Sequence, residues 1–237
     1  PSSGVRVNGI QYDLATAAKR NTWNAANSDR VLYGAAVSNY NATHATALAN
    51  VDTTADKFTA ANLATLKRVA KTASPKIRPF KTKSGYEYFV AFAGTNAFRD
   101  LKISLETVNK DARPREQNGM DSNPLFQDGD QIYDGVIVRE VPEISNFVTS
   151  VWTTLLTAGA SSARVEPVFL CGQQAVAMAW GQMAKPTFRK EDDYGFITGT
   201  GIEMAYGIAK MFKKHPNTGS NLKQWGVATG FFASAAD

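Results

Sequence analysis

The segment that most constrains the fold is residues 86–92, which read Tyr-Glu-Tyr-Phe-Val-Ala-Phe. Its aromatic and β-branched side chains are typical of a strand, and apolar residues fall on both of the faces that alternate along a strand. A strand of this kind belongs inside a sheet, with other elements over both of its faces. We therefore predict a buried central strand here and a layered fold around it.

The clearest element to pack on that strand is a helix over residues 59–73. Thr59 can cap its N-terminus, and Ser74-Pro75 ends it, because the residue before a proline avoids the helical conformation. The apolar residues of this segment recur at helical spacing: Leu63, Leu66, Val69 and Ala70. The basic residues fall on the opposite, outward side: Lys67, Arg68 and Lys71.

The remaining elements interleave without a repeating β-α-β unit, which predicts an α+β fold and not a doubly wound one. Further helices are expected over residues 12–27, 28–36 and 95–109, and further strands over 132–141, 165–170 and 225–233. Residues 37–58 are mostly Asn, Thr and Ala, and residues 113–130 contain several turn dipeptides. We predict that both are long loops, and that residues 37–56 and 113–130 contact neighbouring subunits because neither has enough apolar side chains to fold alone.

Composition restricts the kinds of site that the chain can hold. The 237 residues are 43% apolar, enough for a large core, but no apolar run approaches the roughly 20 residues of a membrane span, and the first residues lack the apolar core of a secretory signal. Cys171 is the single cysteine, and His44 and His215 are the two histidines. An internal disulfide and a structural zinc site are thereby excluded, which fits folding inside a cell.

The charges are unevenly distributed. Residues 57–115 hold 13 basic and 4 acidic side chains, a balance of +9, whereas residues 116–237 hold 9 and 13, a balance of −4. Such asymmetry suits a chain that contacts copies of itself or lies near phosphate, although a solvated basic face explains it equally well. Lys67, Arg68 and Lys71 are the candidate interface or DNA-facing residues.

Motifs of catalysis are missing from the sequence. There is no GxxxxGK[ST] phosphate loop and no GxSxG nucleophile motif, and Gly199-Thr200-Gly201 lacks a third glycine. Glu191-Asp192-Asp193 could bind a divalent cation, but it follows Arg189-Lys190 and is better explained as a surface ion-pair patch. Cys171 is better explained as a buried, inert thiol. We predict no catalytic residue, no cofactor and no metal, and therefore no enzyme.

The order of several motifs resembles a known family. These are Tyr12-Asp13-Leu14, Trp23, Asp29 to Gly34, Ile77-Arg78-Pro79-Phe80, Asn123-Pro124-Leu125-Phe126, Ile132 to Glu140, Phe169 to Ala175, Asp193-Tyr194-Gly195 and Trp225 to Thr229. Together they resemble the tailed-bacteriophage (Caudovirales) major capsid proteins, the family of the phage N-four coat protein, which has the Hong Kong 97-type fold. The likeness covers nearly the whole chain, but of the family's N-terminal arm and extended hairpin only the last strand has a counterpart, at residues 5–10.

The resemblance implies a domain layout. Residues 1–56 would hold the end of the extended hairpin, the leading helices and a loop. Residues 57–92 with 221–237 would form a peripheral domain, a long helix on a sheet, and residues 93–220 an axial domain. The helix at 59–73, the strand at 86–92 and the C-terminal strand should then lie together.

The resemblance also implies a function and partners. The chain would assemble in the host cytoplasm, as hexamers and pentamers of itself, into the icosahedral shell of a virion. Packaged double-stranded DNA would be held by non-specific charge, a cement protein is a further candidate partner, and no membrane is involved. The alternative is a basic, non-specific nucleic-acid-binding protein that uses residues 57–115. Against it, the aromatic residues there follow a strand pattern instead of alternating with Lys and Arg.

Overall fold

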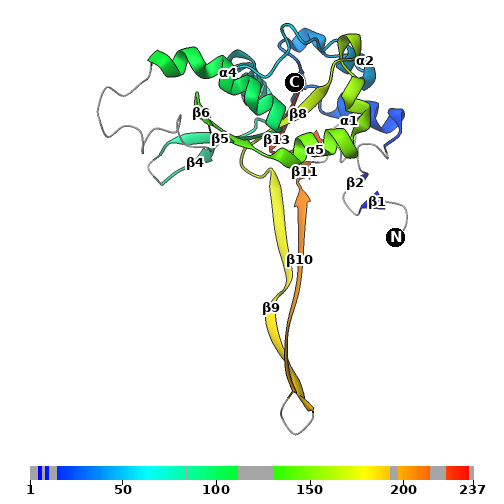
Figure 1. Ribbon diagram of the computed structural model, residues 1–237, viewed down its shortest axis with the longest axis vertical. Coiled ribbons are helices and arrows are strands. Elements are labelled where there is room, and N and C mark those ends of the chain that lie inside the picture. Colours follow the sequence, from blue (N-terminus) through cyan, green and yellow to red (C-terminus); the bar gives the residue numbers. More distant parts are fainter. Residues whose placement is uncertain are drawn as a thin grey trace.

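The computed structural model describes residues 5–6, 9–10, 15–83, 85–111, 131–192, 197–213 and 223–234. A body of one mixed sheet and several helices carries a long two-stranded arm that projects away from it (Figure 1). The predicted α+β class is confirmed.

The sheet of the body brings together strands from distant parts of the chain. Its order is β3-β13-β8-β5-β7-β6, with β4 beside β5. β13 runs parallel to β3 and antiparallel to β8, and β5 runs antiparallel to β8 and parallel to β7. The strands are β3 (Val31–Tyr33), β4 (Phe80–Lys81), β5 (Glu87–Ala93), β6 (Gln131–Tyr133), β7 (Val136–Glu140), β8 (Val165–Cys171) and β13 (Val227–Ala233). The C-terminal strand and the 86–92 segment therefore share one sheet, on either side of β8, as predicted.

The helices are α1 (Ala17–Ala26), α2 (His44–Ala49), α3 (Ala60–Thr72), α4 (Thr95–Asp111) and α5 (Pro142–Ser150), with 3-10 turns at Val37–Asn39, Thr153–Thr157 and Ala160–Ser162. The helices predicted over residues 12–27, 59–73 and 95–109 form, whereas the one over 28–36 does not, and α2 and α5 were not predicted. The Thr59 side chain accepts a hydrogen bond from the Asn62 backbone at 3.3 Å, which confirms the predicted cap of α3.

Two groups of buried residues lie on opposite faces of the sheet. On one face α3 and α4 cover a main core that includes Leu66, Leu101 and Phe232. On the other, a second core joins Phe231 to residues of α2, α5 and the Thr153–Thr157 turn. Since successive side chains of a strand point to opposite faces, Phe231 and Phe232 tie β13 into both cores. Every residue of β13 is buried.

The strand β5 is central in the sheet, but one of its faces is only half covered. Phe89, Ala91 and Ala93 are buried beneath the helices, whereas Val90 and Phe92 on the other face are half-exposed. The predicted burial on both faces is therefore wrong. The cause is that residues of α3 and α4 pack on the same face, and the second core covers the opposite face only near β3 and β13.

Three predictions for local structure need correction. The helix expected over residues 28–36 is instead strand β3, which pairs in parallel with β13. Residues 37–56 contain α2 and contribute Ala47, Leu48 and Val51 to the second core. The prediction that this segment is a long loop with too few apolar side chains to fold alone is therefore wrong. The single strand expected over 132–141 is a hairpin of β6 and β7, because Asp134 and Gly135 adopt φ of 46° and 67° and make a tight turn.

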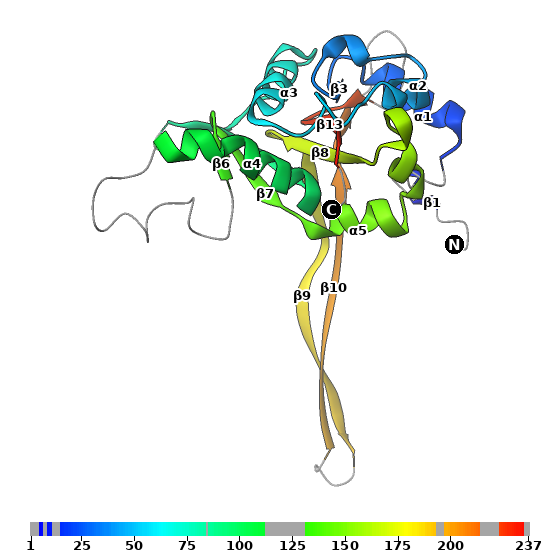
Figure 2. The same cartoon turned by 45° about the horizontal axis from the view of Figure 1, so that its top comes forward.

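The arm is the element that sequence patterns did not show. Its strands are β9 (Val176–Asp192) and β10 (Ile197–Lys210), paired antiparallel. They follow β8 and precede β13 along the chain, and they project away from the body (Figures 1 and 2). At its base β11 (Phe212–Lys213) pairs with β12 (Lys223–Gln224). A short hairpin of β1 (Val5–Arg6) and β2 (Gly9–Ile10) forms near the N-terminus. The loop predicted over 113–130 lies outside the described residues.

Candidate assembly surfaces

The basic residues predicted on the 59–73 helix do not behave alike. Arg68 and Lys71 are exposed on α3, as expected for its outward side. Lys67 is partly buried instead. Its Nζ lies 2.9 Å from Asp134 Oδ1 and also donates to the Asp134 carbonyl oxygen, so it joins α3 to the β6–β7 turn. The structure thus corrects the outward placement of Lys67, while a role in an interface or toward DNA stays a prediction for all three residues.

His44 is buried in the second core and is part of a hydrogen-bond network. Its Nδ1 lies 2.6 Å from the hydroxyl oxygen of Tyr33, and that hydroxyl donates to Asn24 Oδ1 at 2.9 Å. Trp23 and Phe231 approach the imidazole with ring centroids 5.9 and 5.3 Å away. Burial, together with the positive charge of Arg20, lowers the pKa of His44 to about 4. The imidazole is therefore neutral at pH 7, and its contacts with Tyr33, Trp23 and Phe231 make it part of the packing of the second core.

The other candidate reactive groups give no reaction centre in the part of the chain that the structure describes. Burial raises the pKa of the Cys171 thiol to about 11, which agrees with an unreactive cysteine. Among the described residues no group of His, Cys, Asp and Glu could hold a metal ion, and no helix is long and apolar enough to cross a membrane. The side chains of Glu191-Asp192-Asp193 and His215 fall outside what is described.

The arm has two chemically different faces. Residues directly opposite in an antiparallel pair share a face, and the register pairs Met178 with Ile208, Trp180 with Tyr206 and Pro186 with Ile202. One side, here called the apolar face, therefore holds Val176, Met178, Trp180, Pro186, Phe188, Ile202, Met204, Tyr206 and Ile208, with Thr200 opposite Phe188 and Lys210 opposite Val176 at its two ends. Near the body the reverse side, the small face, holds Ala177, Ala179, Ala205, Gly207 and Ala209.

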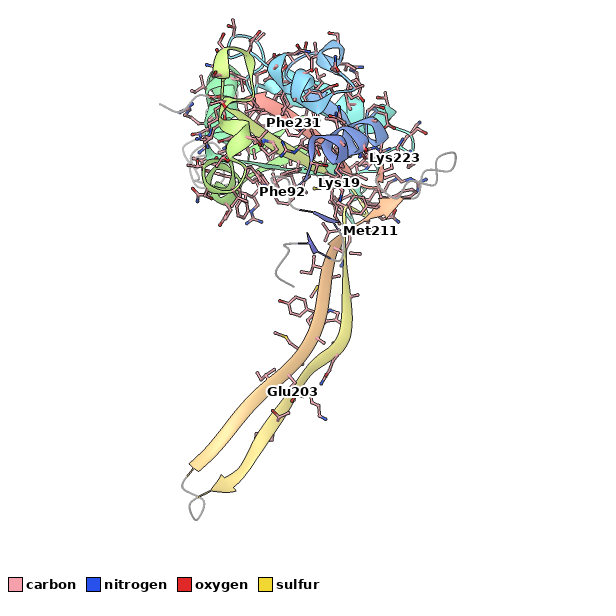
Figure 3. All side chains as sticks on the ribbon, turned by 90° about the vertical axis from the view of Figure 1, so that its right-hand side faces the viewer. Lys19, Phe92, Glu203, Met211, Lys223 and Phe231 are labelled. Atoms are coloured by element: carbon pink, nitrogen blue, oxygen red, sulfur yellow. The ribbon has the colours of Figure 1, made fainter. Side chains whose placement is uncertain are left out.

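The large side chains of the apolar face are uncovered. The rings of Trp180 and Tyr206 pack at an interplanar angle of 43° with centroids 5.4 Å apart, yet about half of each side chain remains exposed, and Phe188 is 76% exposed. Figure 3 shows side chains standing along the arm with nothing from the body beside them. The Gly207 position is also open, since a Cβ there would meet no atom within 4 Å. Within the described chain, no other element packs on the apolar face or on the small face of the arm.

A second uncovered surface continues from the base of the arm. It consists of Val90 and Phe92 of β5, Ile137 of β7 and Phe169 of β8, here called the sheet underside. Register places Val90 beside Ile137 and Phe92 beside Phe169 on one face. Lys210, at the base of β10, has its Nζ 5.8 Å from the centroid of the Phe169 ring, and burial lowers its pKa to about 8. Figure 3 shows Phe92 on the side of the body from which the arm departs.

An α+β body with a projecting arm and uncovered apolar faces is typical of a chain that builds a larger assembly. Comparison with known proteins agrees. The sequence model of a family described as phage capsid protein matches residues 6–234. The chain belongs to the phage capsid protein family, which makes it a structural protein and confirms the predicted resemblance. No curated protein matches it.

Solved structures of phage capsids are similar to the chain. A chain of the cyanophage Pam1 capsid asymmetric unit has 42% sequence identity and a TM-score of 0.77, covering 99% of this chain and 62% of its own length. A chain of the capsid of Ralstonia phage GP4 has 16% identity and a TM-score of 0.54, covering 89% of this chain and 54% of its own, and supports the fold alone. The chain thus spans less than two thirds of the length of these relatives.

Proposed function

We propose that this chain is the major capsid subunit of a tailed phage and self-assembles, as hexamers and pentamers, into an icosahedral shell around double-stranded DNA. The observation that carries the proposal is the 42% identity to the Pam1 capsid chain over 99% of this sequence. The uncovered arm and sheet underside support it, because a shell subunit keeps surfaces for its neighbours that an isolated globular protein would bury.

The finer features of the proposal follow from the family resemblance. The fold is of the Hong Kong 97 type, with residues 57–92 and 221–237 as peripheral domain and 93–220 as axial domain. The sheet of the body includes strands from both ranges, β5 and β13 from the first and β7 and β8 from the second. The two domains would therefore share a sheet and move as one unit. Assembly takes place in the host cytoplasm, and a cement protein is a candidate additional partner.

The test is an electron micrograph of the purified protein. The 237-residue chain is expressed, purified and brought to increasing concentration, and the samples are viewed in negative stain. Closed shells, or rings with five-fold and six-fold symmetry, are the expected result. A protein that stays monomeric at every concentration, with a single narrow boundary in sedimentation, would contradict the proposal.

The basic residues of α3 have a supporting role in the same proposal. Arg68 and Lys71 are exposed and lie in the +9 region of the sequence, so they are suited to contacts with phosphate or with an acidic patch of a neighbour. Charge of this kind binds DNA without reading its sequence, since contacts to phosphate carry no base information. Non-specific binding of nucleic acid, considered above as an alternative function, is thus proposed as one property of the capsid subunit.

A further inference from the structure

A buried cluster of charged side chains lies where the arm joins the body. Arg30 is completely buried, and its guanidinium donates to the two carboxylate oxygens of Asp29, through Nε at 3.1 Å and through a terminal nitrogen at 3.2 Å. Lys223 of β12 approaches the same carboxylate, with its Nζ 3.0 Å from Asp29 Oδ2. We call these three residues the base cluster. A bidentate pair of arginine and carboxylate fixes the orientation of both side chains.

The other hydrogen bonds of Arg30 join segments that are far apart in the sequence. One terminal nitrogen donates to the carbonyl oxygens of Gln224 and Trp225, with a distance of 3.4 Å to Trp225. The second donates to the carbonyl oxygen of Pro75 at 3.3 Å. The guanidinium therefore connects the link between α1 and β3, the segment after α3, and β12. The Gln224 backbone is held from its other side as well, because its N–H donates to Asn27 Oδ1 at 2.8 Å.

The carboxylate of Asp29 is charged in this place. Burial by itself raises the pKa of a carboxyl group, but hydrogen bonds from Arg30, from the Ser74 backbone N–H at 2.8 Å and from Lys223 together hold the pKa of Asp29 below its ordinary value. Opposite charges thus meet in the base cluster at neutral pH. Removal of one member would leave a buried charge without its partner, so the three residues act as a unit.

β12 passes this restraint on to both strands of the arm. It pairs with β11, which follows β10 after the single residue Met211. The Trp225 backbone N–H donates to the Met211 carbonyl oxygen at 3.0 Å, and the Met211 N–H donates to Ala175, the residue before β9, at 3.1 Å. Figure 3 shows Met211 where the arm meets the body, with Lys223 on the body side of this junction.

The direction of the arm depends on this junction because little else restrains it. None of the described side chains of β9 and β10 belongs to either core, and the Lys210 contact with Phe169 is itself at the foot of the arm. Phe188 lies 12 residues beyond the start of β9, roughly 40 Å at the rise of a strand, so a turn of about 10° at the base moves it by roughly 7 Å. Small changes at the junction therefore become large displacements of the arm.

We infer that the base cluster is a lock that fixes the direction in which the arm leaves the body. Charged groups whose hydrogen bonds need one geometry permit fewer arrangements than an apolar contact of the same size. A fixed arm also loses less freedom when it binds any partner, which favours binding. The inference concerns the single subunit, so it does not depend on the proposed function.

The test uses the partly exposed members of the cluster, because loss of the fully buried Arg30 would endanger the fold. Lys223→Met removes one charge, and Asp29→Asn removes the other with little change of shape. Lys67→Met is the matched control. It also removes a lysine from a partly buried ion pair, with 15% of the Lys67 side chain exposed against 11% for Lys223, but that pair joins α3 to the β6–β7 turn, away from the arm. Lys223→Arg keeps the charge and should act as wild type.

The direction of the arm is measured by double electron–electron resonance. Spin labels are attached at Ala61→Cys on the exposed side of α3 and at Phe188→Cys on β9, in a Cys171→Ala background. The protein is diluted until sedimentation velocity shows monomers, and circular dichroism with thermal unfolding checks the fold of each variant. Lys223→Met and Asp29→Asn should at least about double the width of the distance distribution, since the long arm amplifies freedom at its base. Lys67→Met and Lys223→Arg should leave the width unchanged.

Three results would overturn the inference. Unchanged distributions in folded Lys223→Met and Asp29→Asn would show that the backbone contacts of the junction suffice. Equal broadening in Lys67→Met would mean that loss of any ion pair in the body loosens the arm. Unfolding of both cluster variants while Lys67→Met stays folded would assign the cluster to the stability of the body and not to the direction of the arm.

Discussion

At the scale of single residues, His44 connects stability to pH. Burial in the second core holds the pKa of its imidazole at about 4, whereas an unfolded chain binds the proton near pH 6.5. The neutral form is therefore favoured by folding. Its contribution to the free energy of unfolding is complete above pH 6.5 and is lost as the pH falls from 6.5 through about 4.

We expect His44→Gln to remove this pH dependence. Between pH 7 and pH 4, the free energy of unfolding of the wild type should fall by up to about 3 kcal/mol more than that of the variant. Urea unfolding of both proteins at several pH values in this range is the measurement. Both proteins contain the same carboxyl groups, so the loss of stability that comes from protonation of carboxylates in this pH range is common to both and cancels in the comparison. Parallel pH profiles would contradict the role of His44.

Cys171 gives a second prediction at this scale. Because burial raises the pKa of its thiol to about 11, little thiolate is present at pH 8. Alkylation by iodoacetamide at pH 8 should be slower on the order of 100-fold in the folded protein than in the same protein unfolded by urea, since the thiolate is the nucleophile. Mass spectrometry of timed samples measures both rates, and equal rates would show that the thiol is accessible and ionised.

At the scale of elements, the cap of α3 is a direct test of local sequence reasoning. The Thr59 side chain accepts from the Asn62 backbone, and its loss leaves one of the first N–H groups of the helix without that acceptor. Thr59→Ala should lower the free energy of unfolding by about 1 kcal/mol, whereas Thr59→Ser, which keeps the oxygen, should change it little. Denaturant unfolding of the three proteins compares them, and equal losses in both variants would exclude the cap as the cause.

The arm should be the least protected part of the isolated subunit. Its hydrogen bonds join only two strands, and none of its described side chains belongs to either core. Amide hydrogens of β9 and β10 should therefore exchange faster than those of β8 and β13 in the unassembled chain. Hydrogen exchange followed by mass spectrometry measures this, with the strands of the body as internal reference. Protection of the arm equal to that of β13 would mean that it is already covered.

The elements that sequence predicted well are those with strong local signals. α3 has a cap, an apolar stripe and a terminating proline, and β5 is rich in aromatic and β-branched residues. Residues 31–33 became a strand because β13, almost 200 positions later, pairs with them. The arm was missed for a related reason. Near the body its strands alternate large apolar residues with Ala and Gly. This pattern differs from the alternation of apolar and polar residues in a half-buried strand, and it differs from helical spacing. Neither face of the arm packs on another element of the described chain, so no such element constrains the pattern.

At the scale of the whole molecule, the basic middle region can be tested with two residues. Arg68→Gln with Lys71→Gln removes exposed charge, while Lys67 is kept because it pairs with Asp134. The variant should hold less DNA in assembled particles, and the difference from wild type should shrink as the salt concentration rises, since a subunit that neutralises fewer phosphates has a shallower salt dependence. DNA content is measured by absorbance of purified particles at several salt concentrations.

The control for this experiment removes the same amount of charge elsewhere. Lys19→Gln with Lys185→Gln lies outside residues 57–115 and should leave DNA content unchanged. Equal losses in both variants would mean that only the net charge of the subunit matters. No loss in either would show that Arg68 and Lys71 are a solvated face. Neither variant should change subunit stability by more than about 0.5 kcal/mol, because exposed charges contribute little.

The position of β13 determines when the subunit can be completed during its synthesis. β13 lies between β3 and β8. In the described chain it is the strand that pairs with both of them, so it links β3 to the rest of the sheet. A ribosome must therefore release residues 227–233 before the sheet can close and both cores can be sealed. Until then β3 stays unpaired and α1 and α2 lack the surface on which they pack. Nascent chains would thus lack a closed sheet until translation has passed β13.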